Sequence, residues 1–260
     1  VYKRQILYRE ENCDIDFSRY HIRWIMESKK TIKHILEVAF SNCTSIFSGI
    51  IIGFLIPKIL SVEGYGLYKT FTLYMTYAGF FSLGIIDGIV LEYGGYDFEQ
   101  LDKRLFRAYW KFYAVIHIFF AAVLVIIAAT SHNSDIRFIM CMLAINMIAN
   151  NFTGYFQQIS QITQRFGEYS FRKILQSSLS ILTAILLYVG FSVGYTISYK
   201  IYVITVVFVN VNLVLWYFWT YRSIVFGKSC NFLLIKRNVF HLSIIGFPLL
   251  FANLCSTLIL

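Results

Sequence analysis

Six polar side chains recur at helical spacing in one uncharged stretch of the chain. They are Asn146, Asn150, Thr153, Gln157, Gln161 and Gln164. At about 100° per residue, these positions fall within an arc of about 80° on one helix face. Amide groups donate and accept hydrogen bonds without carrying charge, which suits the hydroxyl groups of sugars. The pattern favours the lining of a water-filled cavity, and hydrogen bonding between helices is the alternative.

A single acidic residue, Asp87, lies in the sequence Gly84-Ile85-Ile86-Asp87-Gly88 near the end of another apolar stretch. An ionisable group in a membrane span is a candidate relay for protons or substrate. A structural role, as an interfacial acid or a helix cap, explains the position equally well. Gly84 and Gly88 form a small-xxx-small pair, as do Gly49 and Gly53, and such pairs allow helices to approach closely.

Other polar residues in the apolar stretches are scattered. Asn42, Asn210 and Asn212 are further candidates for the cavity lining. His117 is interpreted as a hydrogen-bonded core residue rather than a titrating group. Pro248 should kink or break its helix. The chain has no nucleophile elbow, no histidine pair at metal-binding spacing and no phosphate loop, so we expect no enzyme activity, catalytic residue, metal or cofactor.

The elements that hold these residues are predicted to be membrane-spanning helices. Of the 260 residues, 58% are hydrophobic and 14% are charged, whereas a soluble domain carries about a quarter charged residues. Seven stretches have few or no charged residues and about the 20-residue length that crosses a bilayer as a helix. They are residues 35–56, 69–90, 112–130, 138–162, 174–193, 201–221 and 239–260. We therefore predict an all-α integral membrane protein.

Basic residues are unevenly distributed between the connecting segments. Of the 23 lysines and arginines, 19 lie in residues 1–34, 91–111, 163–173 and 222–238. Because basic segments stay in the cytoplasm, we predict a multi-pass membrane protein with a cytoplasmic N-terminus. The sequence Met26-Glu27-Ser28-Lys29-Lys30 before the first span is a common start of inner-membrane proteins, so we expect the bacterial inner (plasma) membrane. The net charge of +9 is then a consequence of topology, and no nucleic-acid partner is expected.

Residues 97–107 are predicted to form a short interfacial helix. Asp97 and Gln100 would make a capping box. Phe98, Leu101 and Leu105 would share one face, with basic residues available for lipid phosphates.

The two ends of the chain are interpreted separately from the fold. Residues 1–25 are expected to be a non-native leader that precedes the true initiator, Met26. The seventh apolar stretch reaches Leu260 without a polar flank, so we expect the natural protein to continue beyond it.

The stretch from Ser41 to Asp102 resembles the polysaccharide transporter family, which includes the O-antigen and capsular flippases of the MATE-like superfamily. The resemblance rests on Pro57-Lys58-Ile59-Leu60, on Glu63-Gly64-Tyr65-Gly66 and on the glycine-flanked Asp87. Gly246-Phe247-Pro248, with Asn253, resembles the start of that family's second lobe. The resemblance implies a six-helix N-terminal lobe over residues 26–221, a cytoplasmic linker over 222–238, and the first helix of a second lobe over 239–260.

By this resemblance, the protein would move an undecaprenyl-diphosphate-linked oligosaccharide from the cytoplasmic to the outer leaflet by alternating access. Its partners would be that lipid-linked oligosaccharide, membrane lipids, a coupling ion (proton or sodium) and polysaccharide assembly proteins. The family's basic cavity residues have no match, because no predicted span interior holds Lys or Arg. Such basic residues would then lie in the part of the natural protein that is expected beyond Leu260, or the amides would take their role.

Three alternatives follow from the same residues. A MATE-type drug or cation exporter would favour an acidic residue deep in the first span, where only Asn42 stands. A membrane-embedded glycan polymerase or acyltransferase would need a large outside loop or catalytic His and Arg residues. A non-transporting scaffold would be favoured if the amide stripe were buried in helix contacts.

Overall fold

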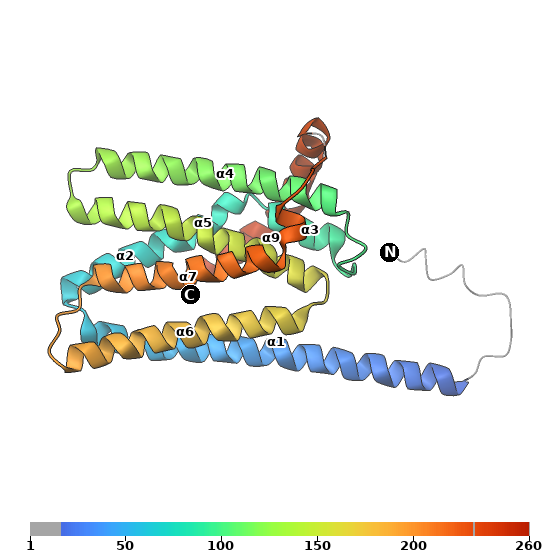
Figure 1. The fold of residues 1–260 in the computed structure, drawn as a ribbon, viewed down its shortest axis with the longest axis horizontal. Coiled ribbons are helices and arrows are strands. Elements are labelled where there is room, and N and C mark those ends of the chain that lie inside the picture. Colours follow the sequence, from blue (N-terminus) through green and yellow to red (C-terminus); the bar gives the residue numbers. More distant parts are fainter. Residues whose placement is uncertain (1–16, 231, 260) are drawn as a thin grey trace.

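The computed structural model describes residues 17–230 and 232–259, and this part of the chain is helical without strands (Figure 1). Residues 1–16 of the expected leader therefore lie outside the described part, and the first helix begins upstream of Met26. The elements are α1 (Phe17–Ile59), α2 (Val62–Ala78), the 3-10 helix η2 (Gly79–Ser82), α3 (Ile85–Tyr93), α4 (Lys103–Thr130), α5 (Ser134–Ile162), α6 (Phe166–Ser192), α7 (Tyr199–Thr220), α8 (Arg222–Val225) and α9 (Phe232–Ile259).

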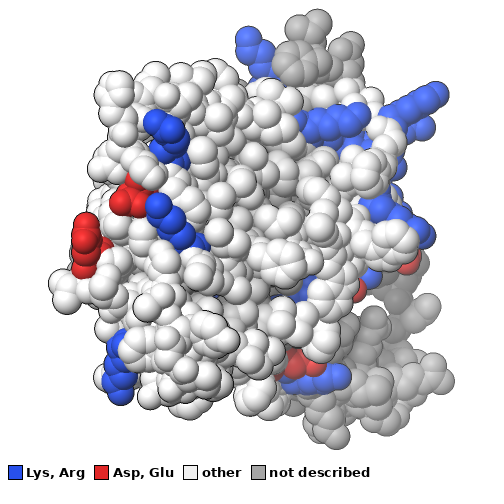
Figure 2. Space-filling model, turned by 60° about the vertical axis from the view of Figure 1, so that its left-hand side comes forward, with Lys and Arg blue, Asp and Glu red and all other residues white. Residues whose placement is uncertain are grey.

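Among the described residues, five helices are long and apolar enough to cross a membrane, namely α1, α4, α5, α6 and α7. The pair formed by α2–η2 and α3 would make a sixth span. This confirms the prediction of a multi-span helical membrane protein. On the face drawn in Figure 2, charged residues gather toward two ends and leave a wide uncharged surface between them. Residues 239–259 of the seventh predicted span lie in α9, which is not among these candidate spans.

The connecting segments separate into two groups. The segments after α3, α5 and α7 lie at the same end of the bundle as the N-terminal part of α1 (Figure 1). We call this the basic end, because it carries residues 91–111, 163–173 and 222–238. The turns after α1, α4 and α6 lie at the opposite end. The predicted grouping of the basic segments agrees with this arrangement, while the assignment of the basic end to the cytoplasm stays a prediction.

The second span is broken, so the prediction of one continuous helix over residues 69–90 is wrong. The axes of its two parts, residues 62–82 and 85–93, differ by 53°. Leu83 (φ 51°) and Gly84 (φ 72°) both adopt the left-handed conformation, which cannot continue a right-handed helix. Asn151 of α5 donates its Nδ2 hydrogen to the Ala78 carbonyl oxygen at 3.2 Å. That bond satisfies a backbone group that the end of α2 leaves free.

Three glycines let α3 and α9 pack backbone to backbone. A Cβ atom on Gly88 would collide with the Leu242 carbonyl oxygen, and one on Gly246 would collide with the Gly84 carbonyl oxygen. The Gly84–Gly88 pair therefore makes the close approach that its spacing predicts. The Gly49–Gly53 pair makes no such close approach, because a Cβ atom added to either glycine would have no neighbouring atom within 4 Å.

Two local predictions need correction. The helix α9 runs through Pro248 from Phe232 to Ile259, so the predicted break does not occur, while a kink at this proline stays a prediction. The interfacial helix over residues 97–107 is replaced by a turn in which Gln100 Oε1 accepts the Asp97 N–H at 3.2 Å, as in the expected capping box. Asp102 is the residue that caps α4, accepting the Arg104 and Leu105 N–H groups. The helix therefore starts only at Lys103.

The largest apolar core lies at the basic end and joins α4, α5 and α7. It is rich in aromatic residues, among them Phe106, Tyr109, Trp110, Tyr113, Phe152, Tyr155, Phe156, Tyr217 and Tyr221. His117 is fully buried, and its Nδ1 lies 2.8 Å from the Tyr113 carbonyl oxygen. Its interpretation as a hydrogen-bonded core residue agrees with this geometry.

Candidate functional site

A cleft of about 720 Å³ opens between α1 and the junction of α5 with α6. Asn42 and His34 line it from α1, and Gln161 and Gln164 line it from the end of α5 and the following turn. Three amides that the sequence marks as cavity candidates are thus brought together, although Asn42 is more than a hundred residues from the other two. Ile35, Val38 and Ala39 supply the apolar wall.

The turn between α5 and α6 presents the two glutamines. Gln164 adopts the left-handed conformation, with φ 57°, which ends α5 sharply. Its N–H donates to the Gln161 carbonyl oxygen at 3.0 Å, and the Arg165 N–H donates to the Ser160 carbonyl oxygen at 2.8 Å. These bonds fix the backbone that carries both side chains, so the amides lie on an ordered turn.

A lysine from α6 joins the α1 amide at this site. Lys173 Nζ donates to Asn42 Oδ1 at 2.6 Å and to the Tyr169 hydroxyl oxygen at 3.2 Å. Among the described residues, no carboxylate lies within 4 Å of Lys173. The nearby acid on α1, Glu37, is paired with His34 at 3.3 Å and with Lys33 at 3.8 Å. The positive charge of Lys173 is therefore held by neutral oxygen atoms.

A second basic residue of α6 is buried, which sequence reasoning missed. Arg172 Nη2 donates to Thr220 Oγ1 at 2.7 Å, and Nη1 lies 3.5 Å from Glu168 Oε2. The guanidinium group also lies 4.3 Å from the centre of the Tyr217 ring. Because α6 already begins at Phe166, Arg172 lies inside a candidate span. Arg172 lies in the second turn of this helix, and the expectation that no span interior holds Lys or Arg stays a prediction.

The remaining members of the amide stripe do not line the cleft. Asn146 is buried and accepts a hydrogen bond from Asn210 Nδ2 at 2.8 Å. Asn210 Oδ1 in turn accepts from Gln176 Nε2 at 3.0 Å, so this network ties α5 to α7 and α6. Thr153 is buried, Gln157 is half-buried and Asn150 is exposed. Interhelical hydrogen bonding thus describes Asn146, and a cavity role for the other three stays a prediction.

Asp87 lies outside the cleft, in the first turn of α3. An acid at this position is stabilised by the partial positive charge of a helix N-terminus. The Asn253 side chain of α9 donates to Asp87 Oδ1 at 3.5 Å. The residue therefore lies at the contact between α3 and α9, and its role as a relay or as a structural residue stays a prediction.

No protein-family model, curated protein or solved structure matches the chain. What the structure itself establishes is a multi-span helical membrane protein with a polar cleft at one end.

Proposed function

We propose that this chain is the N-terminal lobe of a flippase that carries an undecaprenyl-diphosphate-linked oligosaccharide from the cytoplasmic to the outer leaflet. The observation that carries the proposal is the cleft in which Asn42, Gln161 and Gln164 meet beside Lys173. Amides suit the hydroxyl groups of a glycan, and a lysine is a point charge that suits phosphate. The two chemistries stand together at the end of a membrane lobe.

The same site disfavours a cation exporter. A cationic substrate would need an unpaired acidic residue, whereas the cleft carries Asn42 on α1 and Lys173 next to it. Glu37 is already engaged by His34 and Lys33. The charge at the cleft therefore matches an anionic lipid-linked substrate better than a drug cation.

Two features of the fold support a transport role. Broken membrane helices recur in secondary transporters, where unwound backbone borders the substrate path, and the second span is broken at Leu83 and Gly84. The contact of α3 with α9 joins the six-span lobe to the segment that resembles the start of a second lobe. Alternating access by rocking of two lobes would move this joint.

Reconstitution of the full-length protein in liposomes tests the proposal. The substrate is a fluorescent undecaprenyl-diphosphate oligosaccharide, and the readout is the fraction that becomes accessible to a glycan-cleaving enzyme on the far side. We expect Asn42→Ala, Gln161→Ala and Lys173→Gln to slow translocation. The matched control is Gln158→Ala, on the same helix but outside the cleft.

Translocation at the wild-type rate by all three cleft variants would contradict the proposal. Equal slowing in Gln158→Ala would also contradict it, because the effect would then not belong to the cleft.

A further inference from the structure

We infer that the groove between α4 and α9 is a binding site for one anionic phospholipid, with an acyl chain in the groove and the phosphate at Lys111. The groove has a volume of about 510 Å³, within the range of about 300–1,000 Å³ that is typical of ligand pockets. It lies on a different helix pair from the proposed glycan cleft and does not depend on that function.

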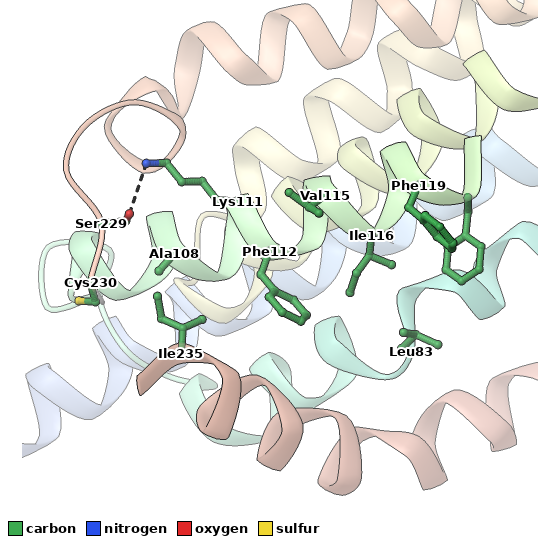
Figure 3. Close-up of a pocket in the computed structure, with 11 residues that line it drawn as sticks. Leu83, Ala108, Lys111, Phe112, Val115, Ile116, Phe119, Ser229, Cys230 and Ile235 are labelled. Carbon is green, nitrogen blue, oxygen red and sulfur yellow. Dashed lines mark hydrogen bonds between the residues drawn. The ribbon is translucent and has the colours of Figure 1, made fainter. Parts of the chain in front are cut away.

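The walls of the groove are apolar and follow one face of α4. Figure 3 shows Phe112 and Ile116 pointing from α4 toward α9, with Ile235 of α9 and Leu83 of the broken span below them. The α4 members recur at spacings of three and four residues, as expected for one helix face; they are Ala108, Phe112, Val115, Ile116, Phe119 and Phe120. From Lys111 to Phe119 this face extends about 12 Å along the helix, which provides a continuous apolar strip for an extended hydrocarbon chain.

The mouth of the groove is polar and basic. Lys111 Nζ lies 3.3 Å from Ser229 Oγ and 3.3 Å from the Gly227 carbonyl oxygen, and Figure 3 draws the first of these bonds. One turn earlier, Arg107 donates to the Ser223 and Lys228 carbonyl oxygens at 2.7 and 2.8 Å. Among the described residues, no carboxylate lies within 4 Å of either cation. Both positive charges are thus held by neutral oxygens.

The surface beyond this mouth continues the basic character. A neighbouring depression is lined by Lys103, Arg104, Arg107 and Lys228 together with two acids, Glu99 and Asp102. Asp102 is committed to capping α4. Together with Lys111, five basic residues face two acidic ones around the mouth. An apolar groove that ends at such a surface is complementary to an anionic lipid, which places its phosphate at the interface and its chain in the hydrocarbon.

Three of the apolar lining residues are exposed, since Leu83, Val115 and Phe119 are 44%, 66% and 62% accessible. In a bilayer these side chains face hydrocarbon, so a phospholipid can enter the groove sideways without crossing a polar barrier. A zwitterionic lipid has the same chains but lacks the net negative charge. The groove should therefore prefer phosphatidylglycerol to phosphatidylcholine.

Native mass spectrometry of the full chain, released from nanodiscs that contain equal amounts of dioleoyl phosphatidylglycerol and dioleoyl phosphatidylcholine, tests this site. We expect one retained phosphatidylglycerol per protein. Lys111→Gln should weaken its retention roughly fivefold, the effect of one lysine near an anionic lipid, and Val115→Trp should remove it by filling the groove. Both positions are exposed, so both variants should fold.

Matched controls separate the site from general charge and size effects. Lys236→Gln removes an exposed lysine at the same end, and Val125→Trp adds the same bulk to α4 beyond the groove. Both should retain the lipid as the wild type does. Equal retention of the two lipids, retention by Val115→Trp, or equal loss in the controls would overturn the proposal. The proposal would also be overturned if free glycerol phosphate displaced the phosphatidylglycerol while Val115→Trp still retained it. The lipid would then be bound by the basic surface alone.

Discussion

Arg172 and Arg165 contact the same carboxylate, Glu168, but only one of them is buried. Their side chains are 5% and 36% exposed. We expect Arg172→Ala to lower the free energy of unfolding by about 2–3 kcal/mol, because it removes a buried guanidinium with its hydrogen bond to Thr220 and its contact with the Tyr217 ring. Arg165→Ala should cost less than about 1 kcal/mol, as exposed pairs do. Thermal unfolding of both variants in detergent micelles checks the difference, and equal midpoints would contradict it.

Asp87 offers a test that separates its charge from its hydrogen bond. Asp87→Asn keeps the volume and the capacity to accept from Asn253 but removes the negative charge. If Asp87 is a relay, glycan export by the full-length protein should fall while the unfolding midpoint changes little, since a charge at a helix N-terminus is worth about 0.3–1 kcal/mol. The measurement is glycan export by Asp87→Asn, compared with export by the wild type and by Asp87→Ala. Full export by Asp87→Asn would leave only the structural interpretation.

The amide stripe shows what residue spacing can and cannot predict. Helical periodicity placed Asn146 and Gln161 on one face of one helix, and the two residues are indeed on α5. The face meets different neighbours along its length, because α5 packs on α7 at Asn146 and opens toward α1 at Gln161. Spacing along one helix contains no information about which helix lies opposite. The division of the stripe into a buried network and a cleft was therefore not predictable.

At the scale of elements, the glycines of α3 and α9 determine how close the two helices lie. A methyl group at Gly88 would overlap the Leu242 carbonyl oxygen, so Gly88→Ala must push α9 away. Overpacking of this kind costs about 1–3 kcal/mol. Gly53→Ala is the matched control, because its added methyl group would meet no atom within 4 Å. We expect a lower unfolding midpoint for Gly88→Ala alone, and a shift of similar size in Gly53→Ala would show that packing against α9 is not the cause.

Five of the seven predicted spans correspond to single helices that are long and apolar enough to cross a membrane, and the second corresponds to the bent pair of α2–η2 with α3. The ends and breaks of the helices were not predictable. Charge-free length identified α1, α4, α5, α6 and α7 because the bilayer excludes charge. The same criterion placed the start of the fifth span at residue 174, whereas α6 begins at Phe166 and buries Arg172 among aromatic rings. The break at Leu83 could not be predicted from hydropathy, because it depends on the left-handed backbone conformation of a residue whose side chain is apolar.

At the scale of the whole molecule, the two ends differ in charge, and this difference should set the orientation in the membrane. The segments with most of the basic residues lie together at one end of the bundle (Figure 1), while Lys58, Lys69, Arg137 and Lys200 are all that the other connections carry. Because basic segments resist translocation, the end that carries Lys228 should face the cytoplasm. His132 is exposed in the turn between α4 and α5 and should face the outside.

Cysteine labelling of intact cells tests this orientation directly. In a variant without native cysteines, His132→Cys should react with a membrane-impermeant maleimide added outside, whereas Lys228→Cys should react only after the cells are permeabilised. Both side chains are exposed, so unequal burial cannot produce the difference. The reverse pattern would place the basic end outside. The proposed glycan cleft would then open to the wrong leaflet for the proposed export of a substrate made in the cytoplasm, so this labelling result tests the proposed direction of transport as well as the topology.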